Sequence, residues 1–152
     1  MSATYKSKTL TAWLALLGGS VGLHRFYLRG FLDLRGWLYP IPCFLGVMGI
    51  QRMQAFGQDD TLSWVLMPCL GLVLAASMLE GIIVGLMPDE RWHARHNPSF
   101  ADASTLPASG WGVIFAVVLC LLVGAAVLMA TIAFSGQRYF EYQIIEAQKL
   151  SQ

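Results

Sequence analysis

The feature that most constrains this chain is a run of 24 residues without a charged side chain, from Trp111 to Phe134. A second apolar run, from Thr61 to Met87, contains a single carboxylate, Glu80, and a single proline, Pro68. Runs of about 20 apolar residues match the thickness of a bilayer and cross it as helices. Only 12% of the residues are charged, about half of the share that soluble domains carry. We therefore expect an integral membrane protein.

Two shorter apolar segments precede these runs. Residues 9–23 are few for a spanning helix, but flanking basic side chains can reach the interface and extend it. Residues 31–50 include Pro40 and Pro42, which remove backbone donors and predict an interruption. The expected fold is all-α and integral to the membrane, with four transmembrane helices, the second interrupted by proline. Four crossings would place both termini on one side of the membrane.

A cleaved signal peptide is the alternative for the first segment. Two lysines, a brief apolar core and the small residues Gly18, Gly19 and Ser20 occur in the order that such a peptide requires. The apolar character continues through Leu23, however, and no A-x-A-like site is present. We favour a membrane helix.

The expected organisation is a sequence of two helical hairpins and a tail. Residues 1–53 form the first hairpin, and residues 54–136 form the second, with an interfacial loop at 88–110. Within that loop, Pro88 to Asn97 predict a short interfacial helix, since proline suits a first turn and acidic residues follow it. Residues 137–152 form a polar or amphipathic carboxyl-terminal tail that either continues the last helix or lies on the membrane surface.

The polar, glycine-flanked stretch GGSVGLHRFYLRG, residues 18–30, lies where the first apolar segment ends; we call it the hinge. Its arginines are four residues apart, so a helix would present both on one face, where they can hold lipid phosphates. Its aromatic rings suit the headgroup level. The alternative is a plain interfacial turn with basic anchors. The candidate lipid- or partner-binding residues are His24, Arg25, Phe26, Tyr27 and Arg29.

Small residues at helical spacing predict close helix packing in two places. Gly18 and Gly22 form a small-xxx-small pair at the end of the first segment. Ser77, Gly81 and Gly85 form a stripe on the third apolar segment. Both sets suit contact with another helix of this chain, a second copy or a partner membrane protein.

The hinge and its surroundings, from Lys8 to Ile50, resemble the TM-two domain family. The shared features are a glycine-rich helix end followed by His24-Arg25-Phe26-Tyr27-Leu28. Family members usually continue with glycine where this chain has Arg29. The resemblance implies a hairpin of two membrane helices, and the two further apolar segments suggest an extended member from a bacterial inner membrane. It implies little chemistry, and it implies weakly that the hinge faces the cytoplasm.

Glu80 is the one carboxylate deep in an apolar run. Charges at such depth are costly, so they usually face a bundle interior and often have a function. We expect Glu80 at a helix interface, either protonated or paired with an arginine. The alternative is an ordinary interfacial glutamate near the end of its helix.

Asp89, Glu90, His93 and His96 have a spacing that superficially suggests a metal site. Helical metal sites of this type need ligands from several helices, and no second set occurs in the sequence. We therefore expect solvated or headgroup-facing side chains, no metal and no other cofactor. No nucleophile elbow, P-loop or dinucleotide fingerprint is present, so we expect no catalytic residue.

The charge and cysteine counts limit the remaining classes. A net charge of +1 gives no general attraction to nucleic acid. Three cysteines in apolar runs do not suggest a disulfide framework. With four spans, the positive-inside rule leaves the orientation undecided, because five basic residues lie on each side. One side has Lys6, Lys8, Arg52, Arg138 and Lys149, and the other has Arg25, Arg29, Arg35, Arg91 and Arg95.

The function expected from these features is non-enzymatic. The chain would mediate interactions with membrane lipids, a second copy or a membrane protein partner, through its hinge and its small-residue faces. The alternative is a small transporter or channel component that uses Glu80 and the proline-broken helices as a polar path.

Overall fold

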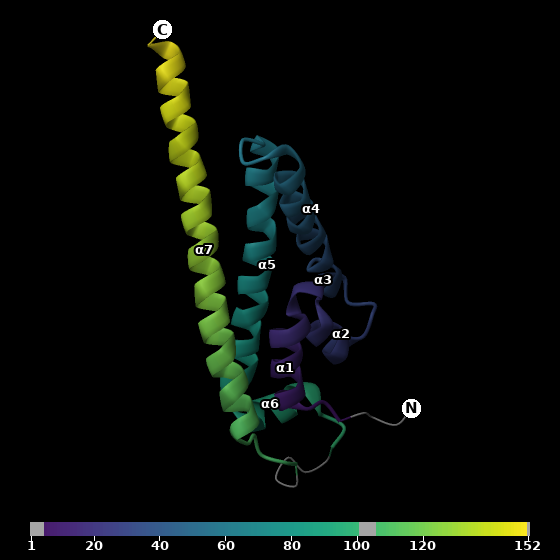
Figure 1. Cartoon of the computed structure of the whole chain (residues 1–152). Helices are drawn as coiled ribbons and strands as arrows, with labels where there is room; N and C mark the ends of the chain where they lie inside the picture. Colours follow the sequence, from purple (N-terminus) through teal and green to yellow (C-terminus); the bar gives the residue numbers. More distant parts are fainter. Residues whose placement is uncertain (1–4, 101–105, 152) are drawn as a thin grey trace.

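The computed structural model describes residues 5–100 and 106–151, and the secondary structure in these ranges is helical, without strands. The helices form an elongated bundle (Figure 1). In chain order they are α1 (Lys8–Gly18), the 3₁₀ turn η1 (Gly19–Val21), α2 (Leu23–Arg29), α3 (Leu34–Trp37), α4 (Pro40–Phe56), α5 (Thr61–Leu86), α6 (Asp89–His96) and α7 (Trp111–Leu150).

Two helices of the described chain, α5 and α7, are long and apolar enough to cross a membrane. These are the two longest apolar runs of the sequence, and α5 continues through Pro68. Asp60 caps α5 by accepting a hydrogen bond from the Ser63 amide. The guanidinium of Arg52 donates to both oxygens of Asp60, at 2.9 and 3.1 Å. The bonds from Arg52 and Ser63 lower the pKa of Asp60 to about 2, so this cap is charged at neutral pH.

The first apolar segment forms a short hairpin instead of the expected spanning helix. Helix α1 ends at Gly18, and Gly22 adopts a left-handed conformation with φ of +77°. A Cβ on Gly22 would lie 2.5 Å from the Gly36 carbonyl oxygen, so glycine is required both for the turn and for the close approach. Helix α2 then runs back toward the start of α1, where the Ser7 amide donates a hydrogen bond to the Tyr27 hydroxyl at 2.9 Å. The pair Gly18 and Gly22 therefore builds a turn rather than a face on one continuous helix.

The second apolar segment is divided at its prolines. The one-turn helix α3 ends at Trp37, and α4 begins at Pro40, where proline is tolerated because a first-turn amide has no helical acceptor. Helix α4 has 17 residues, about 26 Å of helix. It packs closely on α5, since a Cβ on Gly49 would lie 2.7 Å from the Met67 backbone nitrogen.

The chain runs the length of the bundle in α5 and α7, whereas the shorter α4 lies beside the half of α5 that is away from α6 (Figure 1). Helix α1 begins beside α6, where Lys8 pairs with Asp89 at 2.9 Å. Helix α7 ends at the opposite end of the bundle (Figure 1). Two helices long and apolar enough to cross a membrane are found rather than four. The start of α1 and the end of α7 lie at opposite ends of the bundle (Figure 1), and the side of the membrane on which each terminus lies stays a prediction.

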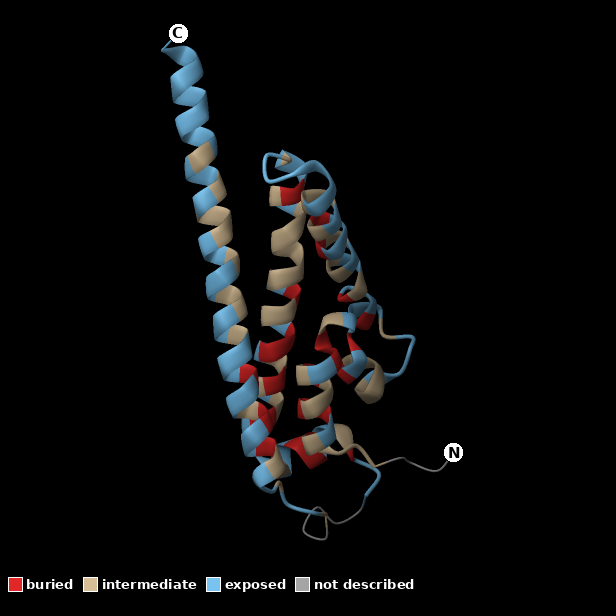
Figure 2. Cartoon of the chain, viewed as in Figure 1, coloured by how far each residue is buried: buried red, intermediate tan, exposed pale blue. Residues whose placement is uncertain are grey.

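The core lies where α1, α5 and α7 meet, near the end of the bundle that carries α6 (Figure 2). The small-residue stripe on α5 makes this approach possible. A Cβ on Gly81 would lie 2.8 Å from the Cys120 sulfur of α7 and 3.2 Å from the Ala15 Cβ of α1. Ser77 lies against η1, where a Cβ on Gly19 would come within 2.5 Å of it, and Gly85 lies against Val117 of α7. The stripe is thus occupied by contacts within the chain.

Helix α7 extends well past the rest of the bundle. It continues without a break through Gly136 to Leu150, so the carboxyl-terminal segment continues the last helix. Figure 2 shows this outer part exposed on nearly all sides. Within the apolar part of α7, large exposed side chains include Phe115, Leu122 and Met129, a surface that suits lipid contact.

Candidate functional site

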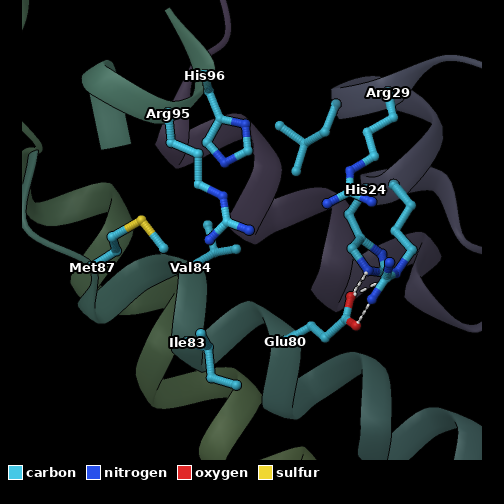
Figure 3. A pocket seen from close by; sticks show the side chains of 10 residues that line it. His24, Arg29, Glu80, Ile83, Val84, Met87, Arg95 and His96 are labelled. Carbon is cyan, nitrogen blue, oxygen red and sulfur yellow. Dashed lines mark hydrogen bonds and ion pairs between the residues drawn. The ribbon is translucent and has the colours of Figure 1, made fainter. Parts of the chain in front are cut away.

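The structure joins two features that lie far apart in the sequence, the hinge and Glu80. Glu80 points from α5 toward α2 (Figure 3). Its Oε2 atom lies 2.6 Å from His24 Nε2 and accepts a hydrogen bond from Arg25 Nε at 3.1 Å. Its Oε1 atom accepts a second bond from the Arg25 guanidinium. One carboxylate therefore holds two consecutive residues of the hinge.

The pairing is partly shielded from solvent. The side chains of His24, Arg25 and Glu80 are 2%, 21% and 27% exposed. The ring of Tyr39 closes one side, edge-on to His24 at 5.4 Å between centroids and 5.6 Å from the Arg25 guanidinium carbon. Glu80 is expected from the sequence to be either protonated or paired with an arginine, and the structure contains the pairing, with Arg25. Because hydrogen bonds to charged groups are strong, the site fixes α2 against α5.

The other aromatic residues of the hinge have separate partners. The Phe26 ring stacks on Phe31 and meets Trp37 edge-on, both at 5.4 Å between centroids. The Tyr27 backbone oxygen accepts a hydrogen bond from Lys6 Nζ at 2.6 Å, and the Lys6 ammonium lies over the Tyr27 ring. These side chains are therefore used to hold the hairpin together, and Arg29 is the most exposed residue of the candidate set.

Helix α6 is fastened to the start of the chain rather than lying free at the interface. Trp92 is fully buried and its indole nitrogen donates to the Lys6 carbonyl at 3.0 Å. Asp89 accepts hydrogen bonds from Lys8 and from the Ser109 amide. Burial raises the pKa of Asp89, but the bonds from Ser109 and the charge of Lys8 outweigh it and lower the pKa to about 2.

The suspected metal ligands of α6 face different partners. Asp89 is hydrogen-bonded to Lys8 and Ser109. His93 Nδ1 lies 3.2 Å from the side-chain amide nitrogen of Asn97. The His96 ring packs against Trp92, with 4.2 Å between the ring centroids. Glu90 is exposed. Across the described residues, no three His, Cys, Asp or Glu side chains come close enough to hold a metal ion.

A cavity of about 210 Å³ opens beside the Glu80 cluster, between α2, the end of α5 and α6. Arg29 and Arg95 reach toward it from α2 and α6 (Figure 3). His96 also lines it, and burial together with the charges of Arg95 and Arg29 lowers the pKa of His96. The cavity therefore combines basic groups from two separate elements, and we call it the basic cavity.

Sequence reasoning identified Arg29 and Glu80 but missed Arg95 and His96 as neighbours of the hinge. The sequence predicts only a solvated interfacial helix for these two residues. The order of the elements contained a clue, because α6 directly follows the end of α5 near which Glu80 lies. To use this clue one must also know that α2 runs back toward the start of α1, which places Arg29 at the same end of the bundle as Arg95 and His96.

Comparison with known proteins found no matching family model, no similar curated protein and no similar solved structure.

Proposed function

We propose that this chain is a non-enzymatic, multi-pass membrane protein of the TM-two type, whose hinge mediates interactions with lipids or with a membrane protein partner. The observation that carries the proposal is the attachment of His24 and Arg25 to Glu80. It gives the residues behind the family resemblance a defined structural partner on a membrane helix. The assignment to a bacterial inner membrane rests on the resemblance alone.

The membrane arrangement that fits best has three crossings and a hairpin. Helices α5 and α7 supply two crossings, and α4 supplies the third, since its 17 residues are near the lower limit of about 17–25 for a spanning helix. Its exposed side chains Ile41, Phe44 and Val47 suit lipid contact. The α1–α2 hairpin would enter from one face and return to it. This replaces the four simple crossings expected from the sequence.

This arrangement supports a particular orientation of the chain in the membrane, because its basic residues are divided unequally between the two ends of the bundle. Lys6 and Lys8 contact α2 and α6, so they join the basic residues of those helices at one end of the bundle. That end then has six basic residues and the other end three, with Arg35 on the short helix α3 between them. The positive-inside rule favours a cytoplasmic location for the richer end, in agreement with the orientation implied for the TM-two hinge. The six are Lys6, Lys8, Arg25, Arg29, Arg91 and Arg95, and the three are Arg52, Arg138 and Lys149.

Reporter fusions at the two termini test the arrangement. A fluorescent protein that matures only in the cytoplasm should be active at the amino terminus, and an alkaline phosphatase that requires the periplasm should be active at the carboxyl terminus. Cytoplasmic activity at both ends would overturn the three-crossing arrangement. Crosslinking in native membranes, followed by purification, tests the interaction function, and recovery of uncrosslinked monomer alone would count against it.

The transporter alternative depends on Glu80 as a polar group at depth. The bonds from His24 and Arg25 occupy both of its oxygens, which gives less support to a carboxylate that binds and releases an ion. Proton and ion flux into liposomes containing the wild type and the Glu80→Gln variant decides between the two. Flux that disappears in the variant would favour transport over the interaction function.

A further inference from the structure

The basic cavity has an excess of positive charge. Three arginines line it, Arg25, Arg29 and Arg95, against one carboxylate, Glu80. Glu80 is already bound to Arg25, so its charge is largely compensated. The Asp33 carboxylate forms an ion pair with Arg29 at 3.9 Å, a distance too long for a hydrogen bond. Within the described part of the chain, the guanidinium groups of Arg29 and Arg95 therefore keep hydrogen-bond donors for an anion.

The position of the cavity in the membrane limits the kind of anion. Glu80 lies six residues before the end of α5, about 9 Å along the helix axis. The polar helix α6 forms the adjoining wall. In the arrangement proposed above, this is the headgroup level of the cytoplasmic leaflet, where anionic lipids are concentrated.

The remaining walls are apolar. They are formed by Leu28 of α2 and by Ile83, Val84 and Met87 near the end of α5. The Ile83 side chain is 55% exposed, and it continues the apolar outer surface of α5. A cavity of about 210 Å³ equals roughly seven water molecules in volume, which is room for a phosphate group and part of a glycerol. A free inorganic anion would make no use of the apolar walls.

We propose that the basic cavity binds the phosphate of an anionic phospholipid, with Arg29 and Arg95 as its ligands and the apolar walls beside the glycerol and acyl chains. Planar guanidinium groups suit phosphate oxygens because they donate two parallel hydrogen bonds. The proposal rests on the membrane arrangement of the preceding section.

Native mass spectrometry of the full chain in mild detergent tests the proposal. The protein is mixed with equal amounts of phosphatidylglycerol and phosphatidylcholine, and the retained lipid is identified. The wild type should retain phosphatidylglycerol preferentially. The Arg29→Gln/Arg95→Gln variant should lose about tenfold or more of this preference, because it lacks the charge-assisted contacts. The matched control Arg91→Gln removes an exposed arginine of α6 that does not line the cavity, and should behave as wild type.

Two outcomes would overturn the proposal. One is equal retention of both lipids, or a preference that the double variant keeps. The other is displacement of the lipid by millimolar inorganic phosphate without any lipid preference, which would assign the cavity to free phosphate. Either result would leave the reporter and crosslinking results unaffected, so failure here is distinguishable from failure of the proposed function.

A second measurement needs no variant. Nuclear magnetic resonance of His96 should show its imidazole pKa rising when phosphatidylglycerol is added, since a bound anion opposes the charges of Arg95 and Arg29. Phosphatidylcholine should produce no such change. An unchanged His96 titration with both lipids would contradict the proposed position of the phosphate.

Discussion

The attachment of the hinge to α5 can be tested by removing the charge of Glu80. The variant Glu80→Gln keeps the shape of the side chain and one carbonyl acceptor, but it loses the negative charge shared by His24 and Arg25. The Arg25 guanidinium, 21% exposed, is then left without its counter-charge. The α2–α5 contact should weaken.

The expected magnitude follows from the contacts. Hydrogen bonds to charged groups contribute about 1.5–3 kcal/mol each, and breaking a fully buried pair costs about 3–5 kcal/mol. The Glu80 side chain is 27% exposed, which reduces the upper figure through solvent screening. We expect the variant to lower the free energy of unfolding by about 2 kcal/mol.

The assay is a denaturing-detergent titration of the protein in mild detergent, followed by tryptophan fluorescence. A double-mutant cycle with Arg25→Gln isolates the interaction, and the coupling energy should be about 1–2 kcal/mol. Glu90→Gln is the control, because Glu90 is exposed, and it should change stability by less than about 0.5 kcal/mol. Additive effects of Glu80→Gln and Arg25→Gln would refute the reasoning, as would a Glu80→Gln variant as stable as wild type.

Three further predictions concern the turn, the acid response and the fastening of α6. Gly22→Ala should destabilise the chain by about 1–2 kcal/mol from the left-handed backbone alone, whereas Gly136→Ala, which meets no neighbour, should be neutral or slightly stabilising; unfolding titrations compare the two. The pKa of Asp89 lies at about 2, below its ordinary value of 3.8, so its stabilisation is complete above about pH 4 and is lost as pH falls toward 2. Asp89→Asn should therefore cost about 1 kcal/mol at neutral pH, after allowance for screening, and flatten the acid limb of the stability profile; a variant whose profile keeps the wild-type slope would contradict this. Trp92→Phe should cost about 1–2 kcal/mol by removing the bond to Lys6, while the same change at exposed Trp111 should have little effect.

The helices that the sequence predicted best are those with unambiguous ends. Helix α5 begins at Thr61, where the predicted apolar run begins, and α6 lies between Pro88 and Asn97 as expected. Their boundaries depend on local backbone chemistry, which is visible in a single sequence. The start of α7 is equally clear, and only the length of its polar extension was left open.

The hairpin was not predictable in the same way. Hydropathy over residues 9–23 suits a short membrane helix, and nothing local states that Gly22 adopts a positive φ. The close passage of Gly36, 14 residues further along, leaves no room for a Cβ at this position, and that contact is not visible in the local sequence. The sequence predicts for Glu80 either protonation or pairing with an arginine, and it does not indicate that the arginine is Arg25 of the hinge. Periodicity tells which residues share a face but not which face of another helix they meet.

Helix α7 is one uninterrupted helix, so the reach and the rotational phase of its tip follow from helix geometry. Leu150 stands 16 residues beyond Phe134 on one uninterrupted helix, about 24 Å further along the axis. One residue inserted near Gly136 would raise the tip by about 1.5 Å and rotate it by about 100°. Seven inserted residues would lengthen α7 by about 10 Å and would return its tip nearly to the original rotational position. A molecule that binds both the tip and the rest of the bundle should tolerate the second insertion better than the first.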